Sequence, residues 1–309
     1  MQKALGADAV ELGQRLQSLW GGYGSLWRAR ATRGAEDLSL IVKHVQPPRD
    51  DRSHSHRRKL RSYDVEAAFY RRHAEACAVP PACRVPRPLH VGSQPSGWLF
   101  VLEDLDAAGF AARRARPGDD DIAVTLGWLA RFHARFLGQA PDGLWKVGTY
   151  WHLATRPDEL ASMRHPALQR AASAIDARLT AARFKTWVHG DAKLENVCFR
   201  GDGAEVALVD FQYVGGGVGV KDVAYFLSSC LTPRECRARV PGYLDHYFRE
   251  LRSALPREGA ELESEWRELF PFAWADFQRF LLGWAPGQFD HDDYANAQVE
   301  QALRSLASR

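Results

Sequence analysis

The chain has 309 residues, of which 46% are hydrophobic, 26% charged and 11% aromatic. This globular composition excludes a disordered chain, a collagen-like repeat and a small disulfide-stapled scaffold. Lysine and arginine (41) outnumber aspartate and glutamate (38) only slightly, giving a formal charge of +3. Nucleic-acid-binding proteins usually carry a larger, clustered excess, so we expect no nucleic-acid partner.

The five cysteines are scattered and form no Cys-x-x-Cys pair. This pattern argues against a zinc site and against a secreted disulfide framework. Residues 1–20 lack the basic-then-apolar layout of a signal peptide, and no segment approaches the ~18 apolar residues that a membrane-spanning helix needs. We therefore expect a cytoplasmic protein without a membrane span.

The first hundred residues predict a small strand-rich unit. Alternating stretches between Trp20 and Val45 indicate strands, and the last of them places Lys43 on the opposite face from Leu40 and Val42. A polar loop is expected up to about residue 62, and its basic run at 57–61 is interpreted as a solvated loop or a patch for a phosphate-rich partner. A helix over 63–76 and a strand over 98–102 follow, the helix with an apolar stripe at Val65, Phe69, His73 and Ala76.

After Asp106 the pattern becomes mostly helical. Apolar residues recur at helical spacing from Ile122 to Phe136, a capping box with proline opens a helix at Thr232, and further stripes cover 274–284 and 299–306. We predict an α+β chain in two parts, residues 1–105 and 106–309. His133, on an apolar face, is interpreted as a core residue with its hydrogen bonds satisfied.

One stretch combines the residues needed for phosphoryl transfer. His189, Asp191 and Asn196 follow a short apolar run, and a second apolar run, 206–209, ends in Asp210 and Phe211. Asp191 can accept the proton of an acceptor hydroxyl, whereas Asn196 and Asp210 offer the hard oxygen ligands that Mg²⁺ prefers. Lys193 can reach the transferred phosphate as a mobile charge. Each residue alone is common in turns, but their joint spacing favours metal-assisted phosphoryl transfer.

These motifs resemble the choline-kinase and aminoglycoside-phosphotransferase superfamily, and most closely its ecdysteroid-kinase-like branch. The matching segments are HGDAKLEN, VDFQ, KDVAYFL, YDVEAAFY, FVLEDLD, LARFHARF and DFQRFLLGWAPGQF, which cover most of the chain from Lys43 to Phe289. Only the first two are specific on their own. The resemblance implies a protein-kinase-like fold: a small antiparallel-sheet lobe with one main helix that binds nucleotide, and a larger helical lobe with the catalytic loop.

The resemblance also implies roles for single residues. Asp191 is the expected catalytic base, with Lys193 beside it, and Asn196 and Asp210 are the expected Mg²⁺ ligands. Lys43 is expected to bind the phosphates of ATP and to pair with Glu66, although Glu66 could instead be a surface residue and Glu75 lies on the same predicted helix. Glu103 and Leu105 lie in the segment that connects the two lobes, and the resemblance implies that the backbone of this segment binds adenine. Gly22, Gly24 and Ser25, in a glycine loop, are also implied to contact the nucleotide.

Three further features bear on these roles. The loop over 21–25 lacks the full glycine pattern of protein kinases, and the same glycines would serve a hairpin turn. Asp222 is either a brace for the catalytic loop, as the resemblance implies, or a plain helix N-cap. Gln212 stands where protein kinases carry glycine, and the short connection after it leaves little room for an activation segment. A protein substrate is therefore not expected. The glycines of 215–219 are expected to let this connection approach the nucleotide or the acceptor closely.

The acceptor is the least determined part. An aromatic set could form either an apolar pocket or part of the core: Tyr150, Trp151, His152, Trp274, Phe277, Trp284 and Phe289. Asp290, Asp292 and Asp293 could attract a cationic acceptor or cap a helix. By resemblance we expect an ATP- and Mg²⁺-dependent kinase that phosphorylates a hydroxyl of a small molecule, with an apolar or steroid-like alcohol favoured. The alternatives are a choline- or aminoglycoside-type kinase and a catalytically silent nucleotide-binding scaffold.

Overall fold

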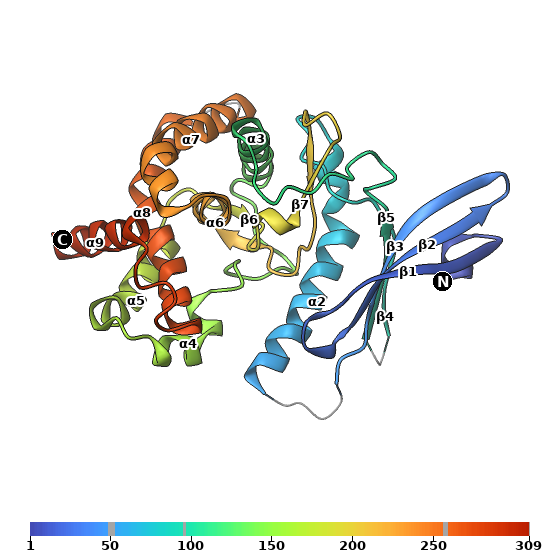
Figure 1. The fold of residues 1–309 in the computed structure, drawn as a ribbon, viewed down its shortest axis with the longest axis horizontal. Coiled ribbons are helices and arrows are strands. Elements are labelled where there is room, and N and C mark those ends of the chain that lie inside the picture. Colours follow the sequence, from blue (N-terminus) through green and yellow to red (C-terminus); the bar gives the residue numbers. More distant parts are fainter. Residues whose placement is uncertain (49–52, 95–96, 256–258, 309) are drawn as a thin grey trace.

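The computed structural model describes residues 1–48, 53–94, 97–255 and 259–308. Its N-terminal part is an antiparallel sheet in the order β1-β2-β3-β5-β4. The strands are β1 (Ala9–Ser18), β2 (Gly24–Arg33), β3 (Glu36–Val45), β4 (Pro88–Gln94) and β5 (Gly97–Glu103), and a short helix α1 (Gln2–Leu5) precedes them. Helix α2 (His54–Arg72) lies between this sheet and the helical part of the molecule (Figure 1).

The two faces of β3 have different environments, as its alternation predicts. Leu40 and Val42 are buried in a small core with residues of β2 and β5. Lys43 is also buried, but its side chain projects from the other face toward α2 and lines a cavity. The strand pattern thereby delivers one ammonium group to the interior of the molecule.

Helix α2 begins earlier than its apolar stripe predicts. The expected polar loop up to residue 62 is wrong for 53–62, because Ser53 caps the helix by accepting a hydrogen bond from the amide of His56; residues 49–52 lie outside the described part. Arginine and lysine favour helices, so the basic run at 57–61 is helical rather than a solvated loop. The helix also ends earlier, at Arg72, and the 3-10 turn η2 (Ala74–Ala78) contains Ala76.

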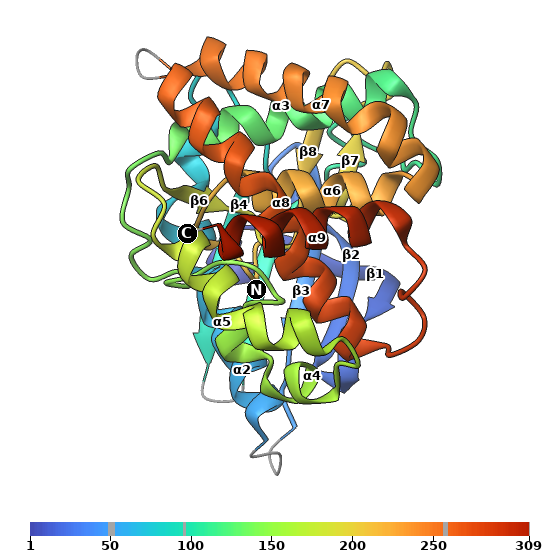
Figure 2. The same ribbon diagram turned by 90° about the vertical axis from the view of Figure 1, so that its left-hand side faces the viewer.

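The C-terminal part is mainly helical, as predicted. Its helices are α3 (Asp119–Arg135), α4 (Pro157–Ser162), α5 (Pro166–Thr180), α6 (Val220–Cys230), α7 (Pro233–Ala254), α8 (Gly259–Trp284) and α9 (Asp293–Ala307). Figure 2 shows α3 and α7 side by side, with α8 and α9 in front of the other helices. The capping box at Thr232 is confirmed, since its side chain and that of Glu235 satisfy each other's backbone amides.

Two small antiparallel ribbons carry the phosphoryl-transfer motif. Strand β6 (Thr186–Val188) pairs with β9 (Gly215–Gly217), and β7 (Val197–Phe199) pairs with β8 (Val206–Leu208). The glycines of β9 do not line the cavity, contrary to the expectation that they approach a ligand. Gly215 and Gly216 approach the protein backbone, and a Cβ on Gly215 would lie 2.2 Å from the carbonyl oxygen of Trp145, whereas Gly217 approaches the side chain of Val188. Glycine is therefore required there for packing.

The two parts of the chain share one hydrophobic core. Phe69 of α2 stacks on Phe211, with ring centroids 4.0 Å apart, and both rings approach Phe132 of α3. We propose to keep the division at residues 105 and 106, because the last sheet strand ends at Glu103. In the described part of the chain, no helix has the length and apolar character needed to cross a bilayer.

Candidate active site

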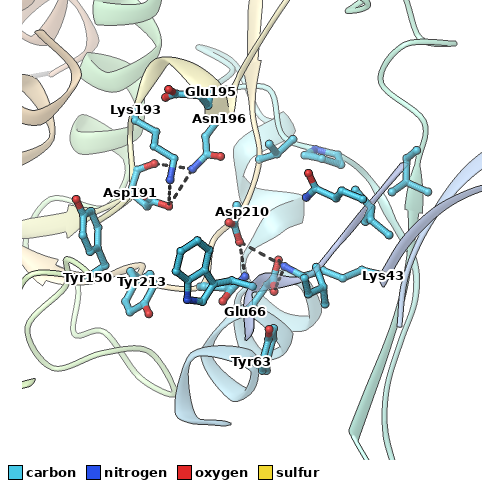
Figure 3. A pocket seen from close by; sticks show the side chains of 18 of the residues that line it. Lys43, Tyr63, Glu66, Tyr150, Asp191, Lys193, Glu195, Asn196, Asp210 and Tyr213 are labelled. Carbon is cyan, nitrogen blue, oxygen red and sulfur yellow. Dashed lines mark hydrogen bonds and ion pairs between the residues drawn. The ribbon is translucent and has the colours of Figure 1, made fainter. Parts of the chain in front are cut away.

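A cavity of about 980 Å³ lies between the sheet and the helical part, and we call it the central cavity. Its lining includes Lys43 and Glu66 from the N-terminal part and Asp191, Asn196 and Asp210 from the ribbons (Figure 3). Side chains that are far apart in the sequence therefore face one shared space. In this arrangement, ligands in the cavity can contact the ammonium and the carboxylates at once.

Asp191 is held by three side chains. Tyr225 donates a hydrogen bond to its Oδ1 (3.2 Å), and Asn196 donates to its Oδ2 (3.1 Å) and to its backbone oxygen (2.8 Å). The ammonium of Lys193 lies 3.2 Å from Oδ2. Tyr225 was not identified from the sequence, although its position three residues after Asp222 on α6 places both on one helix face.

Burial raises the pKa of Asp191 to about 7, because a charged carboxylate loses its hydration there; Lys193 partly opposes this shift. A carboxylate with such a pKa is suited to exchange a proton near neutral pH. Burial also raises the pKa of Tyr225, so its hydroxyl stays protonated and donates to Asp191.

Asp222 holds the loop that carries Asp191 through hydrogen bonds to the loop backbone. Its carboxylate accepts hydrogen bonds from the backbone amides of His189 (2.5 Å) and Gly190 (2.9 Å), and the ring of His133 lies 3.1 Å away. Gly219, not Asp222, occupies the N-cap position of α6, so the simple capping interpretation is wrong. His133 is fully buried and also bonds Tyr247 at 2.8 Å, in agreement with a satisfied core residue.

His189 connects the two motif segments. Its Nδ1 accepts from the amide of Asp191 (3.2 Å), and its Nε2 donates to the carbonyl of Val209 (3.1 Å). Burial lowers the pKa of His189, which favours the neutral ring, and the two hydrogen bonds select this tautomer. The histidine therefore sets the distance between Asp191 and the strand that delivers Asp210.

Lys43 lies between two carboxylates. Its Nζ is 2.7 Å from Glu66 Oε2 and 3.3 Å from Asp210 Oδ1. Burial opposes the charge of Lys43, but attraction to Asp210 and Glu66 outweighs it and raises the pKa of Lys43 above its usual value. The structure thus pairs Lys43 with Glu66, while Glu75 lies beyond the end of α2 in the η2 turn.

Asp210 sits in an unusual backbone conformation. Its φ of 69° is in the left-handed region, which a non-glycine residue adopts only when the surroundings enforce it. Gln212 donates from Nε2 to Asp210 Oδ1 (2.7 Å) and accepts at Oε1 from Ser62 of α2 (3.1 Å). Gln212, which stands where protein kinases have glycine, therefore links Asp210 to Ser62 in the N-terminal part.

The donor set is compatible with Mg²⁺. Asn196 uses its Nδ2 for Asp191, which leaves the amide oxygen for another partner, and the hydrogen bond and ion pair at Asp210 involve only Oδ1. An amide oxygen and a carboxylate oxygen are hard ligands of the kind that Mg²⁺ prefers. Burial opposes the charge of Asp210, but attraction to Lys43 and Lys193 overcomes it and lowers the pKa of Asp210, which keeps this carboxylate ionised.

The connector after β5 lines the cavity, but its side chains are engaged elsewhere. Glu103 pairs with Arg84 (2.6 Å), and the buried Asp104 accepts from Arg28 (2.7 Å) and Ser39 (2.7 Å). The backbone oxygen of Leu105 accepts from the amide of Phe110 (2.8 Å). Glu103 and Leu105 therefore border the cavity on a rigid segment.

The glycine loop has a mainly structural environment. Among the described residues, the lining includes 16–20 but not Gly22, Gly24 or Ser25. A Cβ on Gly24 would lie 2.0 Å from the backbone oxygen of His44, so glycine is needed for β2 to pair with β3. Ser25 accepts a hydrogen bond from the indole of Trp27. The predicted phosphate contacts of these three residues have no geometric support and are not part of our proposal.

The residues expected to form an apolar pocket divide into two groups. Tyr150 and Trp284 line the central cavity, joined by Tyr213, Phe280 and Leu281, which the sequence did not single out. The others do not line it: Trp151, Trp274 and Phe277 are buried, His152 lies 3.5 Å from Asp176, and Phe289 packs against the main core. Asp292 caps α9 by accepting from the amide of Ala295, and neither it nor Asp290 or Asp293 lines the central cavity.

Comparison with known proteins identifies the family. Residues 15–262 match the model of the phosphotransferase enzyme family, and the chain belongs to this family. An ethanolamine kinase from Plasmodium vivax is 11% identical with a TM-score of 0.54, and the alignment covers 97% of this chain and 84% of that one. A thermostable mutant of an aminoglycoside phosphotransferase, solved with ADP and hygromycin B, is 14% identical with a TM-score of 0.50 over 96% of this chain and 95% of that one. None of the curated proteins compared matches the chain.

At these identities the solved structures establish the fold alone. The α+β, protein-kinase-like fold and the membership of the choline-kinase and aminoglycoside-phosphotransferase superfamily are confirmed. The closer likeness to the ecdysteroid-kinase-like branch stays a prediction, as do the individual roles of the site residues.

Proposed function

We propose that this protein is a small-molecule kinase that transfers the γ-phosphoryl group of ATP to a hydroxyl of its acceptor. The observation that carries the proposal is the convergence of Lys43, Asp191, Asn196 and Asp210 on the central cavity, with no member of the set missing. A silent nucleotide-binding scaffold usually lacks the base or a metal ligand. The complete set therefore favours catalysis.

The chain's own groups divide the work between them. Lys43, fixed by Glu66, binds phosphate oxygens of ATP, and Asn196 and Asp210 would hold Mg²⁺, which supplies charge neutralisation to the phosphates. Asp191 accepts the proton of the acceptor hydroxyl as the hydroxyl oxygen forms its bond to the γ-phosphorus. The bond from that phosphorus to the bridging oxygen breaks, and ADP leaves with the bonding electrons.

ATP binding tests the first half of the proposal. Mg²⁺ and ATP together are expected to stabilise the wild type by about 2.7 kcal/mol at a hundredfold excess over Kd, measured by thermal unfolding. Asp210→Asn is expected to lose most of this Mg²⁺-dependent gain, since it removes an anionic ligand. The exposed Asp120 on α3 provides a matched control, and Asp120→Asn should retain the full gain. Equal stabilisation of Asp210→Asn would exclude Asp210 as a metal ligand.

ADP release across a panel of alcohols tests the second half. Acceptor-dependent ADP formation by the wild type supports the kinase. Stabilisation by MgATP without ADP formation from any alcohol in the panel would instead favour the silent scaffold. Phosphate transfer to a protein from a native extract would point to a protein kinase.

The rate should depend on pH through Asp191. Because the pKa of this carboxyl is raised to about 7, its base form is lost as the pH falls below that value. We expect kcat/KM for ATP to fall by about tenfold for each pH unit below the pKa and to level off above it. The measurement is a pH–rate profile at constant ionic strength. A flat profile through this range would show that Asp191 does not act as the base in the rate-limiting step.

A further inference from the structure

The cavity wall next to Asp191 is aromatic. Tyr225, which bonds Asp191, packs against Tyr150 with ring centroids 5.5 Å apart, and Tyr150 meets Phe280 edge-on at 5.2 Å. Phe280 in turn stacks on Trp284 at 6.3 Å. Tyr150, Phe280 and Trp284 line the cavity and Trp284 is 57% exposed, so a row of contacting aromatic rings leads from the neighbourhood of Asp191 to the solvent. Figure 3 shows Tyr150 and Tyr213 on the Asp191 side of the cavity.

Arg156 lies against this aromatic wall. Its guanidinium carbon is 4.9 Å from the ring centre of Phe280, and its Nε donates to the backbone oxygen of Tyr150 (2.7 Å). One carboxylate, that of Glu159, accepts from Nη1 (2.9 Å). Arg156 is only 9% exposed, yet it lines the central cavity. Burial and the nearby charge of Arg58 lower its pKa, which indicates a cation that lacks full compensation.

Arg58 reaches the same region from α2. Its Nη1 donates to the backbone oxygen of Thr155 (3.0 Å) and its Nη2 to the hydroxyl of Ser55 (3.1 Å), both neutral acceptors. Its Nε is buried without a hydrogen-bond partner in the described part of the chain. Within the same part, no carboxylate forms an ion pair with Arg58. Of these two guanidinium groups, only that of Arg156 has an ion-paired carboxylate, Glu159.

A second positive excess lies behind the wall. Lys221 and Arg279 are buried and share one carboxylate, Asp276, whose oxygens lie 3.1 Å and 2.9 Å from them. Trp151 separates this cluster from Tyr150, with ring centroids 5.1 Å apart. On the cavity side, Glu195 is an exposed lining carboxylate but is adjacent to the ammonium of Lys193. The end of the cavity around Arg58 and Arg156 therefore carries more positive than negative charge, which favours an anion over a cation there.

From this geometry we infer that the acceptor is an alcohol with an aromatic or apolar body and an anionic group, carboxylate or phosphate, that Arg58 and Arg156 bind. The inference rests on the proposed function and names its substrate class. The aromatic wall would pack against the body, while the guanidinium groups supply charge-assisted hydrogen bonds to the anion. This assignment differs from the cationic acceptors that the aspartates at 290–293 suggested from the sequence.

Four probes with the same benzyl alcohol body test the charge preference. They are para-(hydroxymethyl)benzoate, para-(hydroxymethyl)phenyl phosphate, the neutral para-(hydroxymethyl)benzamide and the cationic para-(aminomethyl)benzyl alcohol. Their Kd values are measured by calorimetry on the full chain saturated with MgADP, so that turnover is not needed. We expect at least one anionic probe to bind about tenfold or more tightly than the amide, and the amine to bind most weakly. The tighter of the two anions identifies carboxylate or phosphate as the native group.

Variants assign the preference to the two arginines. Arg58→Gln and Arg156→Gln are each expected to weaken the anionic probe by roughly tenfold to a hundredfold and to change amide binding little. Arg170→Gln on the exposed face of α5 removes the same charge away from the cavity and should leave all Kd values unchanged. A merely structural role, in which Arg58 ties α2 to Thr155, would lower stability but preserve the ranking of probes.

Three results would overturn the inference: equal binding of anion and amide, tighter binding of the amine, or a preference that survives both substitutions. Failure of both anionic probes to bind up to their solubility limits would count against it as well. The order of the four Kd values is measured on the wild type, so the charge preference is tested even if a variant misfolds. Binding of MgATP by the same sample separates the two proposals. If the protein does not bind MgATP, the proposed kinase function is wrong. If it binds MgATP but prefers the cationic probe, only the inference of an anionic acceptor is wrong.

Discussion

Replacing Asp191 with asparagine is expected to lower kcat by roughly a hundredfold to ten-thousandfold while ATP binding remains. The amide keeps the size of the side chain and can accept from Tyr225, but it cannot take the acceptor proton. Steady-state ADP release and calorimetric titration with MgATP measure the two properties separately. Asp191→Ala should give the same separation, with less support for Asn196 and Lys193.

The stability of the Asp191→Asn variant makes the result interpretable. Burial raises the pKa of Asp191 to about 7, so its ionised form is disfavoured by folding, and the amide removes that cost. We therefore expect no loss of Tm relative to wild type, and Asp120→Asn on the exposed start of α3 serves as the matched control for activity. Wild-type turnover in Asp191→Asn would remove Asp191 from the mechanism.

The second large effect concerns folding rather than turnover. Asp276→Asn is expected to lower the free energy of unfolding by about 3–5 kcal/mol, because it leaves Lys221 and Arg279 buried without their counter-charge. Both cations are at most 2% exposed, and Asp276 also accepts from the indole of Trp151 (3.1 Å). Urea unfolding at neutral pH measures the difference, again against Asp120→Asn. A change equal to that of the control would show that the ion cluster contributes no net stability.

The pKa of Asp276 also predicts how its contribution to the free energy of unfolding changes at low pH. Burial disfavours its charge, but attraction to Lys221 and Arg279 outweighs this and lowers the pKa of Asp276 from its usual 3.8 to about 2. A depressed pKa contributes stability that is present above the unfolded value and is lost as the pH falls through the folded one. The difference between wild type and Asp276→Asn should therefore shrink as the pH falls from about 4 to 2.

The sequence predicted which residues of the two motif segments meet at the central cavity, because that information is local. His189, Asp191 and Asn196 lie within eight consecutive residues, and Asp210 follows the apolar strand β8. Their spacing in the sequence is therefore enough to recognise them as one group. Asp222 was identifiable only as one of two alternatives. The choice required knowing that the amides of His189 and Gly190 point at its carboxylate, which is a property of the tertiary fold.

The acceptor region could not be predicted in the same way. Helix α8 is buried on most of its circumference, so an aromatic stripe does not reveal that Phe280 faces the cavity while Phe277 faces the core. Arg58 and Arg156 come from α2 and from the start of α4, and no periodicity connects them. The early start of α2 was missed for a related reason: its first turns carry basic residues that lack an apolar stripe.

Contacts from α2 and β3 to the segment around Asp210 link the position of the sheet to the position of this aspartate. Phe69 stacks on Phe211, Ser62 bonds Gln212, and Lys43 lies 3.3 Å from Asp210, so the aspartate and the two residues that follow it are anchored to α2 and the sheet. Any hinge motion that swings the sheet and α2 away from the helices must either drag this aspartate along or break those anchors. In the proposed kinase, opening of the cleft would therefore act directly on the segment that carries Asp210.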